Sequence, residues 1–213
     1  MSRMLYCQSM NSKTEVRRAP EQDRSRTTLQ SIMDASAILI GKHGLDAISM
    51  TQIATQSGMS KASLYRYFPS KQALLIAHAE QSFARNREEM RRIMQKVKDP
   101  EEMLREGFSH YCKQHANSPF LLHLRAAIHA DPVLSKLDLK DSRENAALLV
   151  EFLNHHFPGL ESEFVKTRSL LAMELADSLA RLGARVSAGE RKKLIDEFVN
   201  LFFSDLKNLA QRG

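Results

Sequence analysis

The sequence predicts an all-α protein of about nine helices. Gly (8) and Pro (6) are scarce among the 213 residues, so the chain lacks the turn residues that a many-stranded fold needs. Apolar residues recur at intervals of three and four through successive segments, which is the spacing of amphipathic helices. No segment requires a strand.

Composition narrows the class of protein. A hydrophobic content of 43% excludes a wholly disordered chain. Two cysteines, Cys7 and Cys112, cannot make a disulfide framework and indicate a reducing compartment. No apolar run approaches the ~18 residues of a membrane span, and residues 1–20 lack the apolar segment of a secretory signal. We therefore expect a cytoplasmic protein without a membrane partner.

The N-terminal elements follow from local signals. Residues 1–23 show no periodicity and carry several basic residues, which predicts a mobile basic arm. A first helix is predicted over 25–43, with Gly44 in the left-handed position after its end. Ser49 and Gln52 form a capping box that begins a short helix through about Ser57, and Gly58 follows where a tight turn needs positive φ.

The remaining elements are delimited by serines and prolines. Ser60 caps a second short helix, Lys61–Phe68, and Pro69 ends it. Ser70 then begins a long helix toward Lys98. Later prolines divide the rest into predicted helices at 101–116, 119–130, 141–157, 161–186 and 189–211.

The two short helices, packed on the first helix, predict a helix-turn-helix unit. Its inward-facing residues are Ile53, Met59, Leu64 and Phe68, and Ala54 is small enough for the helices to cross closely. Residues 1–98 carry a net charge of +8 and residues 99–213 a net charge of −2. This asymmetry favours a polyanionic partner for the first half, although a basic solvated surface gives the same counts.

Residues 29–75 resemble the DNA-binding domain of TetR-family (tetracycline-repressor-type) transcriptional regulators. The resemblance lies in Ile53-Ala54, in residues 58–61 (GMSK), in residues 64–71 (LYRYFPSK) and in Leu74. Tyr67 stands where the family often has His, and Met59 where it often has Val. The resemblance implies a helix-turn-helix DNA-binding domain over 24–71 and a larger helical ligand-binding and dimerisation domain over 72–213.

The resemblance also implies roles on double-stranded DNA with a pseudo-palindromic operator. Lys61, Ala62 and Ser63 would face bases in the major groove. Tyr65, Tyr67 and Lys71 would contact phosphates, while Thr51 and Arg66 would reach either group. The full set of expected DNA contacts is Thr51, Ser60, Lys61, Ala62, Ser63, Tyr65, Arg66, Tyr67 and Lys71.

The last two predicted helices carry more apolar surface than the core of a single subunit can bury. Alanines recur every four residues from Ala172 to Ala184 and form a smooth strip, and 189–211 is apolar on more than one side. A four-helix interface between two subunits would bury this surface, as in TetR-like homodimers; a single well-buried bundle core is the alternative. The expected interface residues are Ala172, Leu175, Ala176, Leu179, Ala180, Phe198 and Phe202.

The middle of the chain predicts a small-molecule pocket. Apolar and aromatic residues with a few polar tips follow helical spacing there, which suits a ligand site and equally a core with satisfied histidines. The candidates are Phe108, Tyr111, Cys112, His115, Phe120, His123, Leu124, Phe152 and His156. No Asp or Glu lies on these stripes, so we expect an apolar or aromatic effector and no partner for a cationic one.

Catalytic motifs and metal-ligand patterns are missing from the sequence. Cys112 and His115 are three residues apart, but no second pair has ligand spacing, so no metal or cofactor is expected. No Gly-rich phosphate loop, nucleophile elbow or zincin motif occurs, which disfavours a small helical enzyme. The expected function is a DNA-binding regulator, a repressor released by a small molecule; the alternative is a helical protein–protein adaptor with a degenerate DNA-binding unit.

Overall fold

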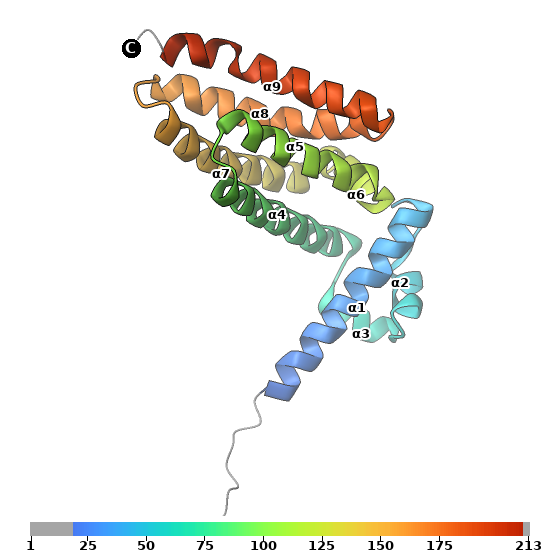
Figure 1. Cartoon of the computed structure of the whole chain (residues 1–213). Helices are drawn as coiled ribbons and strands as arrows, with labels where there is room; N and C mark the ends of the chain where they lie inside the picture. The colour runs from blue at the N-terminus through green and yellow to red at the C-terminus, as the bar shows by residue number, and fades with distance from the viewer. Residues whose placement is uncertain (1–18, 211–213) are drawn as a thin grey trace, which may run out of the picture.

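The computed structural model describes residues 19–210, which form nine α-helices and no strand. In Figure 1, α1 to α3 form one unit, and α4 leads from it into a stack of long helices in which α8 and α9 lie on the far side. The helices are α1 Ala19–His43, α2 Met50–Gln56, α3 Lys61–Tyr67, α4 Lys71–Lys96, α5 Pro100–Ala116, α6 Pro119–Ala130, α7 Pro132–His156, α8 Ser162–Gly183 and α9 Ala188–Ala210.

The predicted fold class is confirmed, and two predicted boundaries are wrong. Helix α1 begins at Ala19, so residues 19–23 are helical and not part of an arm; residues 1–18 of the expected arm lie outside the described part of the chain. Helix α7 begins at Pro132 and not at 141. Pro132 occupies the first helical turn behind the N-cap Asp131, where a proline starts a helix because its missing N–H would have no partner there.

Side-chain caps fix where the helices begin. The Ser49 backbone N–H donates to Gln52 Oε1 over 2.7 Å, and the Gln52 N–H donates back to Ser49 Oγ over 3.3 Å, which is the predicted capping box. Ser60 and Ser70 cap α3 and α4 in the same way, each accepting a backbone N–H at 3.1 Å. Gly44 (φ 77°) and Gly58 (φ 69°) adopt the predicted positive φ.

Two hydrophobic clusters form the interior. The first joins the N-terminal unit to the start of α4, to α6 and to Leu134 of α7. The second lies among α4, α5, α7, α8 and α9. The predicted boundary between residues 71 and 72 therefore divides two segments that share the first cluster, and α6 connects the N-terminal unit to the larger helical part.

Candidate nucleic-acid interface and ligand cavity

The turn between α2 and α3 is held by the backbone and by small residues. The Met59 N–H donates to the Ala54 carbonyl oxygen over 2.8 Å, and the Ser57 hydroxyl donates to the Ile53 carbonyl oxygen over 2.8 Å. Ile53, Ala54 and Leu64 are buried, as predicted. Since both helices are anchored on the core by these residues, the opposite side of α3 is fixed in its orientation.

That opposite side of α3 is polar and exposed. Ser60, Lys61, Ala62, Tyr65 and Arg66 are all exposed. Lys61 Nζ lies 5.9 Å from the centre of the Tyr65 ring, so these two side chains share one surface. Hydrogen-bond donors on a short exposed helix are suited to phosphates and base edges.

Four further predicted DNA contacts differ in accessibility. Thr51 is exposed in the first turn of α2. Ser63 is half-buried, and Ser60 Oγ donates to its hydroxyl over 2.9 Å. Tyr67 is half-buried against the first cluster, and Lys71 Nζ donates to the Leu45 carbonyl oxygen over 2.9 Å. Lys71 and Tyr67 therefore also support the fold of this unit.

The charge of this unit suits a polyanion. From residue 47 to residue 79 the sequence contains no Asp or Glu, while Lys61, Arg66 and Lys71 lie in that range. A phosphate approaching α2, α3 or the start of α4 thus meets no carboxylate from this segment, and cations there would replace the counterions of a nucleic acid.

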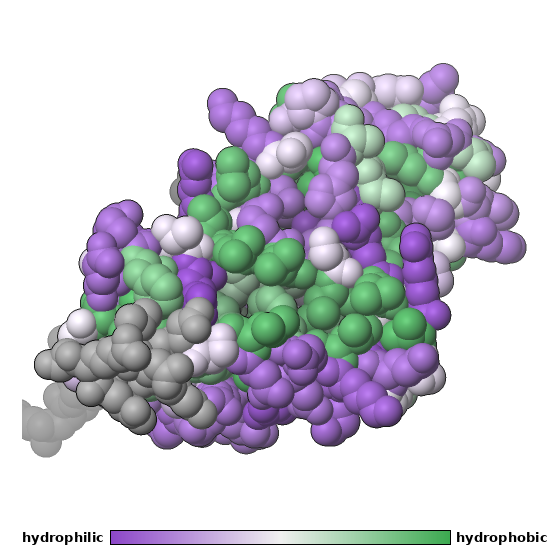
Figure 2. All heavy atoms as spheres, turned by 90° about the horizontal axis from the view of Figure 1, so that it is seen from above, coloured by the Kyte–Doolittle hydropathy of each residue, from purple (hydrophilic) through white to green (hydrophobic). Residues whose placement is uncertain are grey.

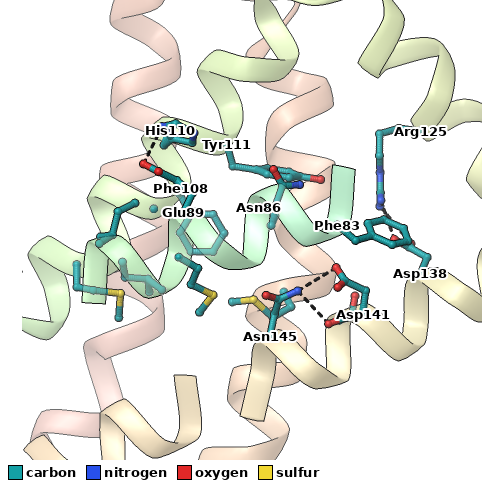
Figure 3. A pocket seen from close by; sticks show the side chains of 18 residues that line it. Phe83, Asn86, Glu89, Phe108, His110, Tyr111, Arg125, Asp138, Asp141 and Asn145 are labelled. Carbon is teal, nitrogen blue, oxygen red and sulfur yellow. Dashed lines mark hydrogen bonds and ion pairs between the residues drawn. The ribbon is translucent and has the colours of Figure 1, made fainter. Parts of the chain in front are cut away.

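A cavity opens between α4, α5, α7 and α8 in the larger helical part. Together with its open mouth it contains about 860 Å³ of empty space. Its apolar lining comes mainly from α4 and α5: Phe83, Met90, Ile93, Met103, Leu104 and Phe108, with Met173 and Ala176 of α8. Its polar lining is Asn86, Glu89, His110, Tyr111, Arg125, Asp138, Asp141, Ser142 and Asn145 (Figure 3).

A buried ion network forms the polar end of the cavity. Arg125 of α6 donates to Asp138 of α7 over 2.7 Å and to Asp177 of α8 over 2.6 Å. Asp141 pairs with Arg87, and Asn145 Nδ2 donates to Asp141 Oδ2 over 2.9 Å. Figure 3 shows Asp138, Asp141 and Asn145 following one another along α7 on one side of the cavity.

The structure does not bring the nine predicted ligand residues into one site. Phe108 and Tyr111 line the cavity. Phe120 and Leu124 belong to the first cluster, whereas Cys112 and Phe152 pack in the second. The other three are histidines away from the cavity lining. The buried His115 donates from Nδ1 to the Tyr111 carbonyl oxygen over 2.9 Å, His123 is exposed beside Gly44, and His156 Nδ1 lies 2.8 Å from the Phe152 carbonyl oxygen.

The sequence analysis missed most of the residues that line the cavity. The expectation that no carboxylate faces the site is wrong, because Glu89, Asp138 and Asp141 line it. Asp138 lies in the stretch that was expected to be non-helical. Once helix 132–156 is known, the spacing 138, 141, 145 places three polar side chains on one face, and this periodicity is the signal that was available.

The predicted alanine strip packs inside the protomer. Ala172 and Ala180 are buried within the protomer, and Ala176 lines the cavity. Small residues allow α8 to lie close to α5 and α7, and this packing uses the strip inside the chain. Phe202 is buried as well, while Leu179 and Phe198 are half-buried against the second cluster.

Leucines on other sides of α8 and α9 remain exposed. Leu171 (55%), Leu175 (40%) and Leu182 (46%) lie on α8, and Leu201 (62%) lies on α9. Figure 2, which looks down onto the end of the molecule where α9 lies uppermost in Figure 1, shows hydrophobic side chains gathered in a patch bordered by hydrophilic ones. An exposed apolar surface of this kind is typical of a protein interface.

Two searches of residues 19–210 limit other functions. None of the helices described has both the length and the apolar content of a membrane crossing. Within the same part of the chain, no three His, Cys, Asp or Glu side chains are grouped as ligands of a metal ion.

Comparison with known proteins identifies both parts of the chain. The pattern of bacterial regulatory proteins of the tetR family matches residues 32–78, and that of the tetracyclin repressor-like C-terminal domain matches residues 98–210. An uncharacterised HTH-type transcriptional regulator of Mycobacterium tuberculosis is 28% identical over 83% of this chain and 85% of its own. The HTH-type transcriptional repressor KstR of the same organism is 25% identical over 86% of this chain and 84% of its own.

Solved structures share the fold. A TetR transcription regulator from Haloarcula marismortui has a TM-score of 0.66 at 17% identity, covering 83% of this chain and 96% of its own. RolR, solved with its ligand resorcinol, has a TM-score of 0.61 at 13% identity, covering 90% and 97%. With both domains matched and the helix-turn-helix in place, the chain belongs to the TetR family and is a DNA-binding transcriptional regulator.

Proposed function

We propose that the protein is a cytoplasmic homodimeric repressor that leaves its operator when a small molecule binds in the cavity between α4, α5, α7 and α8. The observation that carries the DNA-binding part is the exposed donor face of α3 on a unit whose residues 47–79 contain no acid. Residues 24–71 would form the DNA-binding domain and residues 72–213 the ligand-binding and dimerisation domain. No catalytic step is part of this proposal.

On DNA, α3 would lie in the major groove. Lys61, Ala62 and Ser63 at its start would face base edges, with Ser60 at the cap. Tyr65 and Tyr67 would contact phosphates, Lys71 and Thr51 would flank them, and Arg66 would reach base or backbone. Because two half-sites one helical turn apart (about 34–36 Å) suit a two-fold dimer, the operator would be pseudo-palindromic.

Dimerisation would use the exposed leucines of α8 and α9. Leu171, Leu175 and Leu182 follow a 4 and 7 spacing on α8, which sets them on one stripe. Pairing this stripe and Leu201 with their copies in a second chain would bury apolar surface that a monomer leaves in water. Leu175 is the one residue of the predicted interface that is exposed in the protomer.

Helix α6 gives the cavity a route to the DNA-binding unit. Its Arg125 lines the cavity, and its first turn packs on α1 so closely that a Cβ at Gly41 would lie 3.3 Å from the Phe120 nitrogen. A ligand that moves α6 therefore also moves the surface on which α1 packs. The ligand shifts the equilibrium between the DNA-bound and the DNA-free conformation only as far as its affinities for the two conformations differ.

The relatives support repression by a ligand-responsive protein. KstR is named as a repressor and RolR was solved with resorcinol, so one protein similar to this chain is a repressor and another binds a small aromatic molecule. The alternative, a protein–protein adaptor, assumes a degenerate DNA-binding unit. The exposed hydrogen-bond donors of α3 argue against that assumption.

The test starts from DNA selected from a random pool by the full-length protein. We expect a pseudo-palindromic sequence, binding that weakens steeply with salt, and lower transcription in vitro from a promoter that overlaps the selected site. Bound sequences without a repeat, or transcription that rises with added protein, would contradict a repressor. Affinity for DNA that is unaffected by salt would favour the adaptor.

A further inference from the structure

The cavity has an apolar body. Six buried or half-buried side chains make up most of it: Phe83, Met90, Ile93, Met103, Phe108 and Met173. Methionine thioethers adapt to irregular apolar shapes, and aromatic faces attract cations. This part of the wall suits an apolar group and tolerates variation in its shape.

The ion network behind the polar wall has more carboxylates than guanidinium groups. Arg125 lies between Asp138 and Asp177, and Arg87 lies between Asp141 and Glu144. Two guanidinium groups thus face four carboxylates. The other basic groups in reach are exposed. Lys140 and Arg181 lie 3.8 and 3.6 Å from Glu144 and Asp177, and His129 Nε2 lies 2.6 Å from Asp177 Oδ2, so they compensate Asp177 and add little at Asp138 and Asp141.

Asp141 is a cavity-lining carboxylate whose pKa is raised. Burial raises its pKa, and the hydrogen bond and charge of Arg87 offset this only in part, with Glu144 and Asp138 raising it further. A positive charge placed beside Asp141 would favour its ionised form, whereas a negative one would add to the repulsion.

Several polar groups of the wall have no hydrogen-bond partner among the described residues. The Tyr111 hydroxyl, the Asn86 amide and the Ser142 hydroxyl line the cavity, and no hydrogen bond joins them to another residue of that part of the chain. Figure 3 shows Tyr111 and Asn86 on the side of the cavity opposite Asp141 and Asn145. Burial also raises the pKa of Tyr111, which keeps its hydroxyl protonated. A ligand head group would meet donors and acceptors here.

We propose that the effector is an amphipathic organic amine, whose ammonium group is held by Asp141 and Asp138 and whose apolar or aromatic body lies among the phenylalanines and methionines of α4 and α5. This inference rests on the proposed function, since it specifies the ligand of the same cavity. It replaces the expectation that a cationic ligand has no partner in this protein.

Three matched probes test the head group on the free full-length protein. Phenylbutylamine, phenylbutanol and phenylbutanoate share one body and differ in charge. By calorimetric titration at neutral pH, we expect the amine to bind at least about tenfold more tightly than the carboxylate, with the alcohol between them. Equal or tighter binding of the carboxylate overturns the proposal, and so does a lack of binding by all three.

Asp141→Asn tests the contact itself. The amide keeps an acceptor for Asn145 and removes the charge, so the amine should lose about fivefold or more in affinity while the alcohol binds as before. Glu151→Gln is the control, because Glu151 is an exposed carboxylate on the same helix; it should change neither affinity. If the amine binds Asp141→Asn as tightly as the unaltered protein, Asp141 does not hold the head group and the proposal fails. Should Asp141→Asn not fold, the probe series on the unaltered protein still decides.

The titrations contain no DNA, so the two proposals fail separately. If the protein selects an operator but binds the carboxylate best, the proposed function stands and the amine proposal fails. If it binds the amine best but selects no repeated sequence, the amine proposal stands and the repressor proposal fails.

Discussion

Ser36 Oγ of α1 and His78 Nε2 of α4 lie 2.8 Å apart in the buried interior of the N-terminal unit. The Ser36 hydroxyl donates to the Met33 carbonyl oxygen over 2.9 Å, so the contact assigns an Nε2–H on His78 that donates to Ser36. The Phe120 ring of α6 lies 4.7 Å from the His78 ring, between centres. A neutral histidine thus joins the three helices that connect the DNA-binding unit to the rest of the chain.

The first prediction concerns pH and stability. Burial lowers the pKa of His78 from 6.5 to about 4, partly offset by Asp34. Below pH 6.5 the unfolded chain takes up a proton on this residue and the folded chain does not, so stability falls as the pH drops toward 4. The loss amounts to about 3 kcal/mol at the lower end. Urea unfolding at a series of pH values measures it.

His78→Gln separates this residue from the other groups that titrate nearby. Burial also lowers the pKa of His115, which therefore contributes a loss of the same sign. In His78→Gln the free energy of unfolding should fall less steeply between pH 6.5 and 4. His155→Gln, an exposed control, should keep the slope of the unaltered protein. An unchanged slope in His78→Gln would mean that His78 has the same pKa in the folded and the unfolded chain.

The second prediction compares two neighbours on α3. Lys61→Ala should cost about 1–3 kcal/mol of operator binding and relax the choice of sequence, because a lysine that reads a base carries sequence information. Tyr65→Ala should weaken all sequences about equally, since phosphates carry none. Gel-shift titrations on the operator and on variants with one changed base pair measure both effects.

A lysine far from α3 is the control for this comparison. Lys193 is exposed on α9, and Lys193→Ala should keep both affinity and sequence choice. If Lys61→Ala and Tyr65→Ala both retain full affinity, α3 is not the recognition helix.

The third prediction concerns the exposed leucines. Leu175→Asp should convert the dimer to a monomer in sedimentation velocity, because the carboxylate would be buried without a partner in the interface. Leu139→Asp is the matched control: Leu139 is equally exposed (40%) but lies on α7. Operator affinity should fall in Leu175→Asp alone, because two monomers bind the two half-sites independently and lose the gain in affinity that a dimer has from binding both at once. If Leu139→Asp gives the monomer instead, the interface lies on α7.

Local signals were enough to predict the helices and the helix-turn-helix. The bond between Ser49 and Gln52, or the positive φ of Gly58, depends on a few neighbouring residues, and the sequence contains them all. Pro132 shows the limit of such signals, because a proline can end one helix or begin the next. Here a helix begins, because the side chain of the preceding Asp131 accepts hydrogen bonds from the N–H groups of Val133 and Leu134 and so caps α7.

The cavity and the interface depend on contacts between distant residues. Asn86 and Asp141 line one cavity only because α4 and α7 pack together, and neither residue has a local motif. The alanine strip of α8 has the same periodicity whether it packs against α5 and α7 or against a second subunit. Which side of α8 faces inward is set by tertiary packing, and for this reason the exposed leucines replaced the alanines as the proposed interface.

The last prediction removes the centre of the ion network. Arg125→Met leaves Asp138 and Asp177 buried without their main cation and should lower the free energy of unfolding by about 3–5 kcal/mol. Burial alone raises the pKa of Asp177, but Arg125 and His129 outweigh it and the net shift is downward, so in Arg125→Met this pKa should rise. NMR titration of Asp177 measures this pKa.

Arg105→Met is the control: it removes a guanidinium paired with Asp196 on a more exposed site and should cost no more than about 1 kcal/mol of stability. Adding Asp177→Asn to Arg125→Met should recover part of the lost stability, because it removes one of the two unpaired charges. If the Asp177 pKa does not change in Arg125→Met, His129 and Arg181 alone hold it down and Arg125 does not anchor α6 to α8.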